Sequence, residues 1–422
     1  MKVLMLSWEL PPAYVGGVGM VCAEICRELS KYDNLEIEYA MPYGPANFLP
    51  FSSNCNVIGV QHQKMDFKNI NFAKIPSLLS CYETPDEYLS KYHKFLTEGV
   101  DLREGVYKTP KELYGKNIMQ EVELYAQRVA NMYKDKHFDV VHAHDWTTMK
   151  AALLLKELTG VKVIYHVHIT EYDKTGNQGG HPEIIEIEKE GIQKADKVVA
   201  ISQYIRNQLL EKYEADDSKI EVVYNAKIGD LVKTLTKTKL FENKKTVLFM
   251  GRMTMQKGPE YFLYCAKKIL EYRQDVIFVV AGGGDQLKRM IELSCDLGIS
   301  DNVFFHGGAY NRDDANKYFG SADVFVMPSV SEPFGVVPYE AMVKGTPVVI
   351  SRQSGISEIL NNAFKVNFWD TDEMAHRVLG LLDYPALHDS MTINGFNEVD
   401  SHTWEGPVKK LTNIYSNLAK FK

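Results

Sequence analysis

The 422-residue chain has few of the features that mark secreted, membrane-spanning or nucleic-acid-binding proteins. Its six cysteines include no C-x-x-C pair, which indicates reduced thiols rather than a disulfide framework. The longest apolar runs, such as Val276–Ala281, are far shorter than the roughly 18 to 20 residues of a membrane span. Lys and Arg total 48 against 55 Asp and Glu, so there is no basic field for nucleic acid.

A secretory signal is also missing from the first residues. Met1–Leu6 is followed by Glu9 and two prolines, whereas a signal peptide needs about 7 to 15 apolar residues in a row. The 45% hydrophobic and 24% charged residues are typical of a globular protein and argue against disorder. We therefore expect a soluble, cytoplasmic protein of two or three domains. The composition leaves open whether it forms a homo-oligomer.

Short apolar strands alternate with helical stretches along most of the chain. Nearly continuous apolar runs predict parallel strands that helices cover on both faces. Two successive sets of them predict an α/β protein with two doubly wound, Rossmann-like domains. The predicted strands of the two sets are 3–7, 36–40, 57–60, 139–144, 161–167, 197–201 and 221–224, then 246–250, 276–281, 302–306, 323–327, 347–350 and 364–366.

A polar, Lys- and Thr-rich segment at 227–245 separates the two sets. We place the domain boundary there, which predicts a first domain of residues 1–228 and a second of residues 229–402. A tyrosine-rich, largely helical segment at about 62–136 is predicted to be an insertion, either surface packing or part of a substrate-receiving region. Open α/β sheets bind ligands beyond the carboxyl ends of their strands, so two facing domains would enclose a deep cleft.

Three glycines follow the first strand. Gly16, Gly17 and Gly19 stand between the strand and a helix, where the backbone can approach a phosphate. The dinucleotide fingerprint is incomplete because Cys22 replaces its third glycine, which disfavours nicotinamide binding. The alternative interpretation of this loop is a tight turn.

Two H-x-H pairs end neighbouring strands of the first set. They are His142 with His144, followed by Asp145, and His166 with His168. Imidazole and carboxylate groups bind zinc or iron, so a metal site has to be considered. No further set of His or Asp ligands follows the later strands, and the sequence therefore favours no metal. We expect His144 and His168 to reach the cleft and the other two histidines to be structural.

Two cations follow the first strand of the second set. Arg252 and Lys257 lie in the loop after residue 250, at the edge of the sheet where ligands bind. A guanidinium and an ammonium group suit a diphosphate, because the first binds as a bidentate fork and the second as a point charge. The alternative is ordinary surface charge.

A short helix is predicted at about 338–344. Pro338 suits its first turn, and Gly345 stands where a C-terminal cap belongs. The amides of Val336 and Val337 would then form a second anion cradle.

Two carboxylates accompany this helix. Glu340 lies in its first turn, where it could merely stabilise the helix dipole. Glu332 lies in the preceding loop, where no local structural need explains it, and could accept hydrogen bonds from sugar hydroxyls. Two anion cradles, a cation pair and two carboxylates together indicate a diphosphate between hydroxyl-rich groups, as in a nucleotide-sugar.

These motifs resemble the retaining GT-B glycosyltransferases, specifically glycosyltransferase family 4 and its glycogen and starch synthase-like members. The match covers nearly the whole chain, and its most specific part is Glu332-Pro-Phe-Gly335 with Glu340 eight positions after Glu332. The supporting matches are Pro11-Pro12-Ala-x-x-Gly16-Gly17, His144-Asp145-Trp146, His168, and Arg252 with Lys257-Gly258. The resemblance implies an acceptor-side first domain, a nucleotide-sugar-binding second domain, and a closing helix at 403–422 that crosses back onto the first.

The resemblance also implies roles for the matched residues. Glu332 would contact the donor sugar, Glu340 the ribose, and Arg252 and Lys257 the diphosphate. His168 would lie near the reaction centre. The rest of the implied site comprises Gly16, Gly17, Phe334, Gly335, Val336 and Val337 at the donor, Tyr310 stacked on its base, and His144 and Asp145 on the acceptor side.

Some residues depart from the pattern of ADP-glucose-type synthases. Tyr14 replaces a lysine, Gly19-Met20 replaces Gly-Asp, and Glu340 is a second carboxylate that those enzymes generally lack. The donor nucleotide (UDP, ADP or GDP) is therefore open, with UDP- or ADP-glucose as first candidates. The stretch from His168 to Gly180 resembles prokaryotic family-4 proteins assigned as glycogen synthases.

We therefore predict a hexosyltransferase that moves a glucosyl unit to an α-glucan with retention of configuration and without a metal. A family-4 enzyme acting on a mannosyl, lipid or small-sugar acceptor is one alternative. The others are a nucleotide-sugar epimerase on the same fold, a metal-dependent hydrolase built on the H-x-H pairs, and a catalytically silent sugar-binding protein.

Overall fold

The computed structural model describes residues 1–10, 17–43, 54–60, 118–176, 179–229, 233–235, 238–307 and 312–420. Some of the predicted features lie partly or wholly outside these residues, among them the Pro11-Pro12 motif and Tyr14. Gly16 and Tyr310 lie outside the described residues, and so does the predicted insertion before Ile118.

The first half of the chain forms a parallel sheet of order β3-β2-β1-β4-β5-β6-β7. Its strands are β1 (Lys2–Leu6), β2 (Glu36–Met41), β3 (Cys55–Gly59), β4 (Val140–His144), β5 (Lys162–Val167), β6 (Lys197–Ala200) and β7 (Ile220–Val222). Its helices are α1 (Gly17–Leu29), α3 (Ile118–Tyr133), α4 (Trp146–Thr159), α5 (Glu171–Lys174), α6 (Pro182–Lys194), α7 (Gln203–Tyr213) and the 3₁₀ turn η2 (Asp217–Lys219).

The second half forms a parallel sheet of order β10-β9-β8-β11-β12-β13. Its strands are β8 (Lys245–Met250), β9 (Val276–Ala281), β10 (Val303–His306), β11 (Val324–Met327), β12 (Val348–Ser351) and β13 (Phe364–Val366). Its helices are α8 (Pro259–Leu270), α9 (Leu287–Asp296), α10 (Arg312–Ser321), α11 (Val337–Met342), α12 (Thr371–Asp383) and α13 (Pro385–Glu398), with the 3₁₀ turns η3 (Met255–Lys257), η4 (Ser300–Asn302), η5 (Gly355–Glu358) and η6 (Val399–Ser401).

Helices cover both faces of the first sheet because alternate residues of each strand point to opposite sides. In β1, Leu4 and Leu6 pack into a core with α3, whereas Val3 and Met5 pack into a core with α1. Each strand predicted from the sequence is present, with its ends within one or two residues of the prediction. The predicted α/β class with two doubly wound sheets is therefore confirmed.

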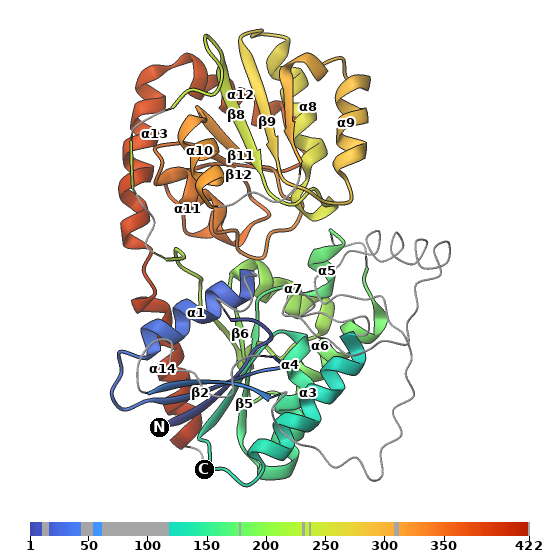
Figure 1. The fold of residues 1–422 in the computed structure, drawn as a ribbon, viewed down its shortest axis with the longest axis vertical. Coiled ribbons are helices and arrows are strands. Elements are labelled where there is room, and N and C mark those ends of the chain that lie inside the picture. The colour runs from blue at the N-terminus through green and yellow to red at the C-terminus, as the bar shows by residue number, and fades with distance from the viewer. Residues whose placement is uncertain are drawn as a thin grey trace.

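The last helix returns to the first sheet. Figure 1 shows the chain running down α13 along the second half and then into α14 (Glu405–Lys420), beside α1. Buried side chains of α14, among them Val408 and Tyr415, share a core with Val3 and Met5 of β1. Both chain ends consequently lie on the half that carries β1.

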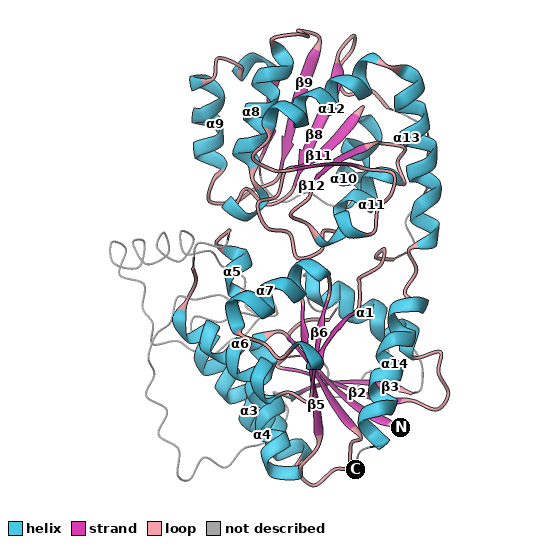
Figure 2. Ribbon diagram, turned by 180° about the vertical axis from the view of Figure 1, so that it is seen from behind, coloured by secondary structure: helices cyan, strands magenta, loops and turns pink. Residues whose placement is uncertain are grey.

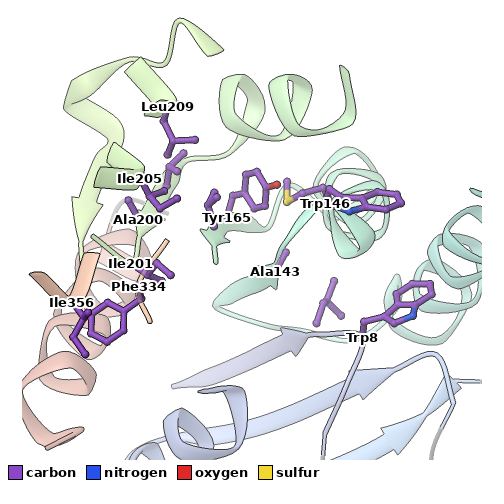
Figure 3. Close-up of a cluster of buried hydrophobic side chains, with 14 of the residues drawn as sticks. Trp8, Ala143, Trp146, Tyr165, Ala200, Ile201, Ile205, Leu209, Phe334 and Ile356 are labelled. Carbon is purple, nitrogen blue, oxygen red and sulfur yellow. The ribbon is translucent and has the colours of Figure 1, made fainter. Parts of the chain in front are cut away.

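The two halves are stacked end to end (Figure 2), and apolar side chains of both pack together where they meet. Figure 3 shows Phe334 and Ile356 of the second half beside Ile201 of the first, with Ile205 farther into the first half. All four belong to one buried cluster. Within the described residues, no helix has both the length and the apolar character that crossing a membrane requires.

Candidate functional site

The loops after β8 and β11 bring a predicted cation and a predicted carboxylate together. The carbonyl oxygen of Gln256 accepts hydrogen bonds from the amides of Val330 (2.9 Å) and Ser331 (3.4 Å), which ties the two loops to each other. Lys257 Nζ consequently lies 2.5 Å from Glu332 Oε2, across 75 residues of sequence. This ion pair is the centre of the candidate site.

Glu332 is held firmly from its backbone. Its amide donates to the carbonyl of Gln353 (3.0 Å), and its own carbonyl accepts from the amide of Gly355 (3.0 Å). The residue is 6% exposed, and Ser329 Oγ donates to the carboxylate at 3.3 Å. A buried carboxylate with a cation and a hydroxyl as partners is a stable hydrogen-bond acceptor.

Two glycines shape these loops. Gly258 has φ +63°, and a Cβ there would lie 2.3 Å from the carbonyl oxygen of Pro328. Gly335 has φ +90°, and a Cβ there would lie 2.9 Å from Cγ of Glu332. Both positions therefore need glycine for conformation and for space.

Other predicted donor residues lie in the same two loops or in α11. Arg252 lies in the loop after β8 and is exposed. Gly335, Val336 and Val337 lead into α11 and are half-buried, as is Glu340 in its first turn.

Phe334 differs from these neighbours. Its side chain is 3% exposed and packs in the contact between the two halves (Figure 3). Its carbonyl accepts from the amide of Ile356 (2.8 Å), which anchors the loop that carries Glu332.

In the first half, α1 begins at Gly17, so that Gly17 and Gly19, which were predicted to precede the helix, belong to its first turn. Gly17 is exposed at the start of the helix. The amide of Gly19 donates to Glu9 Oε2 at 3.3 Å, and a Cβ on Gly19 would lie 2.8 Å from Cβ of Glu9. The close approach of Glu9 explains why residue 19 has to be glycine.

The two H-x-H pairs form one buried stack at the carboxyl ends of β4 and β5. Ring centroids lie 4.4 Å apart for His142 and His144 and 4.3 Å apart for His166 and His168. Hydrogen bonds join the pairs: His144 Nδ1 lies 2.8 Å from His168 Nε2, and His142 Nε2 lies 3.1 Å from His166 Nδ1. His142 Nδ1 also lies 2.7 Å from the hydroxyl of Tyr415 on α14.

Burial keeps these rings neutral. Loss of solvation lowers the pKa of His142 and of His168 to about 3, and it lowers the pKa values of His144 and His166 well below the usual range. At neutral pH each ring therefore has one N–H donor and one bare nitrogen. Such rings can accept a hydrogen bond from a substrate or ligate a metal.

Asp145 positions the second histidine pair. It is fully buried with φ +56°, a conformation that is costly for a residue other than glycine. Its Oδ1 accepts from the amides of His168 (2.7 Å) and Ile169 (3.4 Å). The carboxylate thereby fixes the start of the β5–α5 loop.

Sequence reasoning missed the polar contacts that join the two halves beside Glu332. Ser331 Oγ donates to Asp173 Oδ1 at 2.6 Å and accepts from the hydroxyl of Tyr204 at 2.8 Å. Ser202 Oγ donates to the carbonyl of Pro333 at 2.7 Å. We call Ser331, Asp173 and Tyr204 the latch.

A second contact lies next to the latch. The carboxylate of Glu358 in η5 accepts from the amides of Gln203 (2.8 Å) and Tyr204 (2.7 Å) at the start of α7. The only sequence signal for these contacts is the Thr170-x-x-Asp173 capping box of α5, which predicts a helix start but no distant partner.

Known families match both halves of the chain. The family described as "Glycosyl transferases group 1" matches residues 233–398, which carry the Lys257–Glu332 pair. The family described as "Starch synthase catalytic domain" matches residues 2–221, which is half of the chain. The chain therefore belongs to this second family, that of the starch synthase catalytic domain.

Relatives and solved structures agree with that assignment. An uncharacterized glycosyltransferase of Methanocaldococcus jannaschii is 26% identical over 98% of each chain. A D-inositol 3-phosphate glycosyltransferase of Salinispora tropica is 29% identical over 66% of this chain and 64% of the relative. Sucrose-phosphate synthase from Thermosynechococcus elongatus has the same fold, with a TM-score of 0.72, 18% identity and full coverage of both chains. The predicted family, the GT-B fold and the class of enzyme are confirmed.

Proposed function

We propose that this glycosyltransferase moves a glucosyl unit from a nucleotide-diphosphate sugar to an α-glucan, with retention of configuration. The observation that carries the proposal is the ion pair between Lys257 and the buried carboxylate of Glu332. A diphosphate would bind the cation and a sugar would bind the carboxylate oxygens, and the two side chains are in direct contact.

Donor binding would divide this pair between two partners. A phosphate oxygen of the donor replaces the carboxylate at Lys257, and Arg252 binds the same diphosphate as a fork. The freed oxygens of Glu332 accept hydrogen bonds from hydroxyls of the sugar. The half-buried segment Gly335–Val337 and the exposed start of α1 at Gly17 would offer amides to the phosphates.

The same groups would assist the reaction. As the bond between the sugar and the diphosphate breaks, negative charge grows on the leaving group, and Arg252 and Lys257 stabilise it. His168 of the first half would lie near the sugar. Closure of the two halves around the donor would exclude water and favour transfer over hydrolysis. Attack of the acceptor hydroxyl on the face that the leaving group vacates gives retention, and no metal is needed because the cations supply the positive charge.

Turnover of UDP-, ADP- and GDP-glucose with glycogen or short α-glucans as acceptors tests the proposal, with product sizing as the readout. Lys257→Ala is expected to lower kcat/KM by about 100-fold or more, because it removes a group that binds developing charge. Lys288→Ala on α9 is the matched control, since that lysine side chain is 89% exposed.

Unchanged turnover in Lys257→Ala and Arg252→Ala would refute the proposal. Conversion of the donor sugar without any acceptor product would instead favour the epimerase.

A further inference from the structure

A cysteine lies among the buried histidines of the first half. Sγ of Cys22 and one ring nitrogen from each of His144 and His168 all lie within 4.8 Å of one another. The three side chains come from α1, β4 and the end of β5, and each is at most 5% exposed. The packing of α1 against the sheet brings Cys22 to the histidines. The spacing of these residues in the sequence gives no sign of this contact.

The rings of His144 and His168 each have one nitrogen that makes no hydrogen bond within the described residues. His144 Nδ1 and His168 Nε2 share one hydrogen bond of 2.8 Å, so one ring donates and the other accepts. The outer nitrogens, His144 Nε2 and His168 Nδ1, are buried without a partner among the described residues. Since each neutral ring has a single N–H, one of these atoms is an unused donor and the other an unused acceptor. Buried polar atoms are rarely left without a partner, and a bound water or an ion would satisfy these two.

Two imidazoles and a thiol are the ligand types that zinc prefers. Tetrahedral bonds of about 2.0 to 2.3 Å place ligand atoms roughly 3.3 to 3.8 Å apart, so shifts of about 1 Å would close the present arrangement around an ion. The cation takes a lone pair from one nitrogen of each ring. The hydrogen bond between the rings then breaks, and one of the two rings moves its proton to its other nitrogen. The thiol of Cys22 loses its proton to solvent as the sulfur–metal bond forms.

Neighbouring groups contact two of these residues. Ser7 Oγ lies 3.6 Å from Sγ of Cys22, and Asp145 holds the backbone of His168. The first contact holds the thiol and the second holds the backbone from which the His168 ring extends. The fourth position would be left for water or a substrate atom, as in open zinc sites.

We propose that Cys22, His144 and His168 bind one zinc-like divalent cation per chain. The ion is not a cofactor of sugar transfer. Because it occupies His168, which we place at the donor sugar, its binding excludes the nucleotide-sugar, and this consequence rests on the proposed function. The site is thus an inhibitory one for thiophilic cations.

Co²⁺ is the probe for the site itself, added to full-length protein that has been freed of metal with a chelator. We expect saturation at one ion per chain, visible bands of tetrahedral cobalt, and a near-ultraviolet band from thiolate-to-cobalt charge transfer. Cys22→Ser should abolish the charge-transfer band, and Cys22→Ala is the second variant if serine prevents folding. Cys265→Ser, which changes a buried cysteine of the other half, should leave every band unchanged.

Absence of the charge-transfer band from the unchanged protein overturns the proposal. So does a band that persists in the Cys22 variants or disappears in Cys265→Ser. Cobalt bound without a thiolate band would move the ion to the other group of possible ligands, His142, His144 and His166, and would also overturn it.

Competition with the donor tests the inhibitory consequence. Zn²⁺ is expected to raise the Kd of the nucleotide-sugar by about tenfold or more in the unchanged protein and to have little effect in Cys22→Ser. Equal zinc effects in both would refute the exclusion. The two proposals fail separately, because cobalt spectra need no donor and sugar transfer needs no metal.

Discussion

The latch beside Glu332 should contribute several kcal/mol to the free energy of unfolding and should fix the position of Glu332 in the donor site. Ser331 is fully buried and makes two short hydrogen bonds to the opposite half, one to the carboxyl group of Asp173 and one from the hydroxyl of Tyr204. Its neighbour in sequence is the carboxylate that we assign to the donor sugar. Ser331→Ala removes both bonds and adds no bulk, so it tests whether the latch positions Glu332.

The magnitude follows from the two bonds. A hydrogen bond to a charged group contributes about 1.5 to 3 kcal/mol and a neutral one about 0.5 to 1.5 kcal/mol. Ser331→Ala should therefore lower the free energy of unfolding by about 2 to 4 kcal/mol, and Tyr204→Phe by about 1 kcal/mol. A displacement of about 1 Å at a reacting group can cost roughly 100-fold in rate, so we expect kcat/KM of Ser331→Ala to fall by about 10- to 100-fold.

Urea unfolding and donor turnover measure the two effects. The controls are Tyr272→Phe, whose ring is 74% exposed, and Ser416→Ala on the solvent side of α14. The double variant Tyr204→Phe/Ser331→Ala should show a coupling of about 1 kcal/mol, because the two residues share a hydrogen bond.

Two results would refute this reasoning. Full turnover in Ser331→Ala would mean that the latch does not position Glu332, and additive effects in the double variant would mean that the shared hydrogen bond contributes nothing.

Three further predictions concern stability. Gly258→Ala should lower the free energy of unfolding by about 2 to 4 kcal/mol, because its Cβ would meet the carbonyl oxygen of the residue after β11, whereas Gly298→Ala, with φ +67° and open space, should cost only about 1 kcal/mol in thermal unfolding. Burial raises the pKa of Glu188 to about 8. The folded chain then keeps a proton that the unfolded chain loses above about pH 4.3, so this group makes stability fall as pH rises towards 8. The free energy of unfolding of Glu188→Gln, compared with that of the unchanged chain, should therefore be more favourable at pH 8.5 than at pH 5. The same difference at both pH values would contradict the raised pKa. Tyr415→Phe should cost about 1 kcal/mol through its lost bond to the first histidine of β4, and no loss relative to the exposed Tyr384→Phe would contradict that contact.

The sequence by itself determined the two sheets and the edge at which ligands bind. Each strand is a local apolar run, and its period can be read without knowing any distant contact. The carboxyl ends of parallel strands meet at one edge, so the loops at Lys257 and Glu332 could be placed near each other before their ion pair was known.

The tertiary structure alone decided which side chains meet across long separations. Ser331 contacts Asp173 across 158 residues of sequence. Cys22 of α1 lies near His144 at the end of β4 and His168 just after β5. These contacts depend on the angle at which helices pack on the sheets and on how the two halves join. Those angles are decided by the shape of the whole core, for which no short stretch of sequence carries a signal.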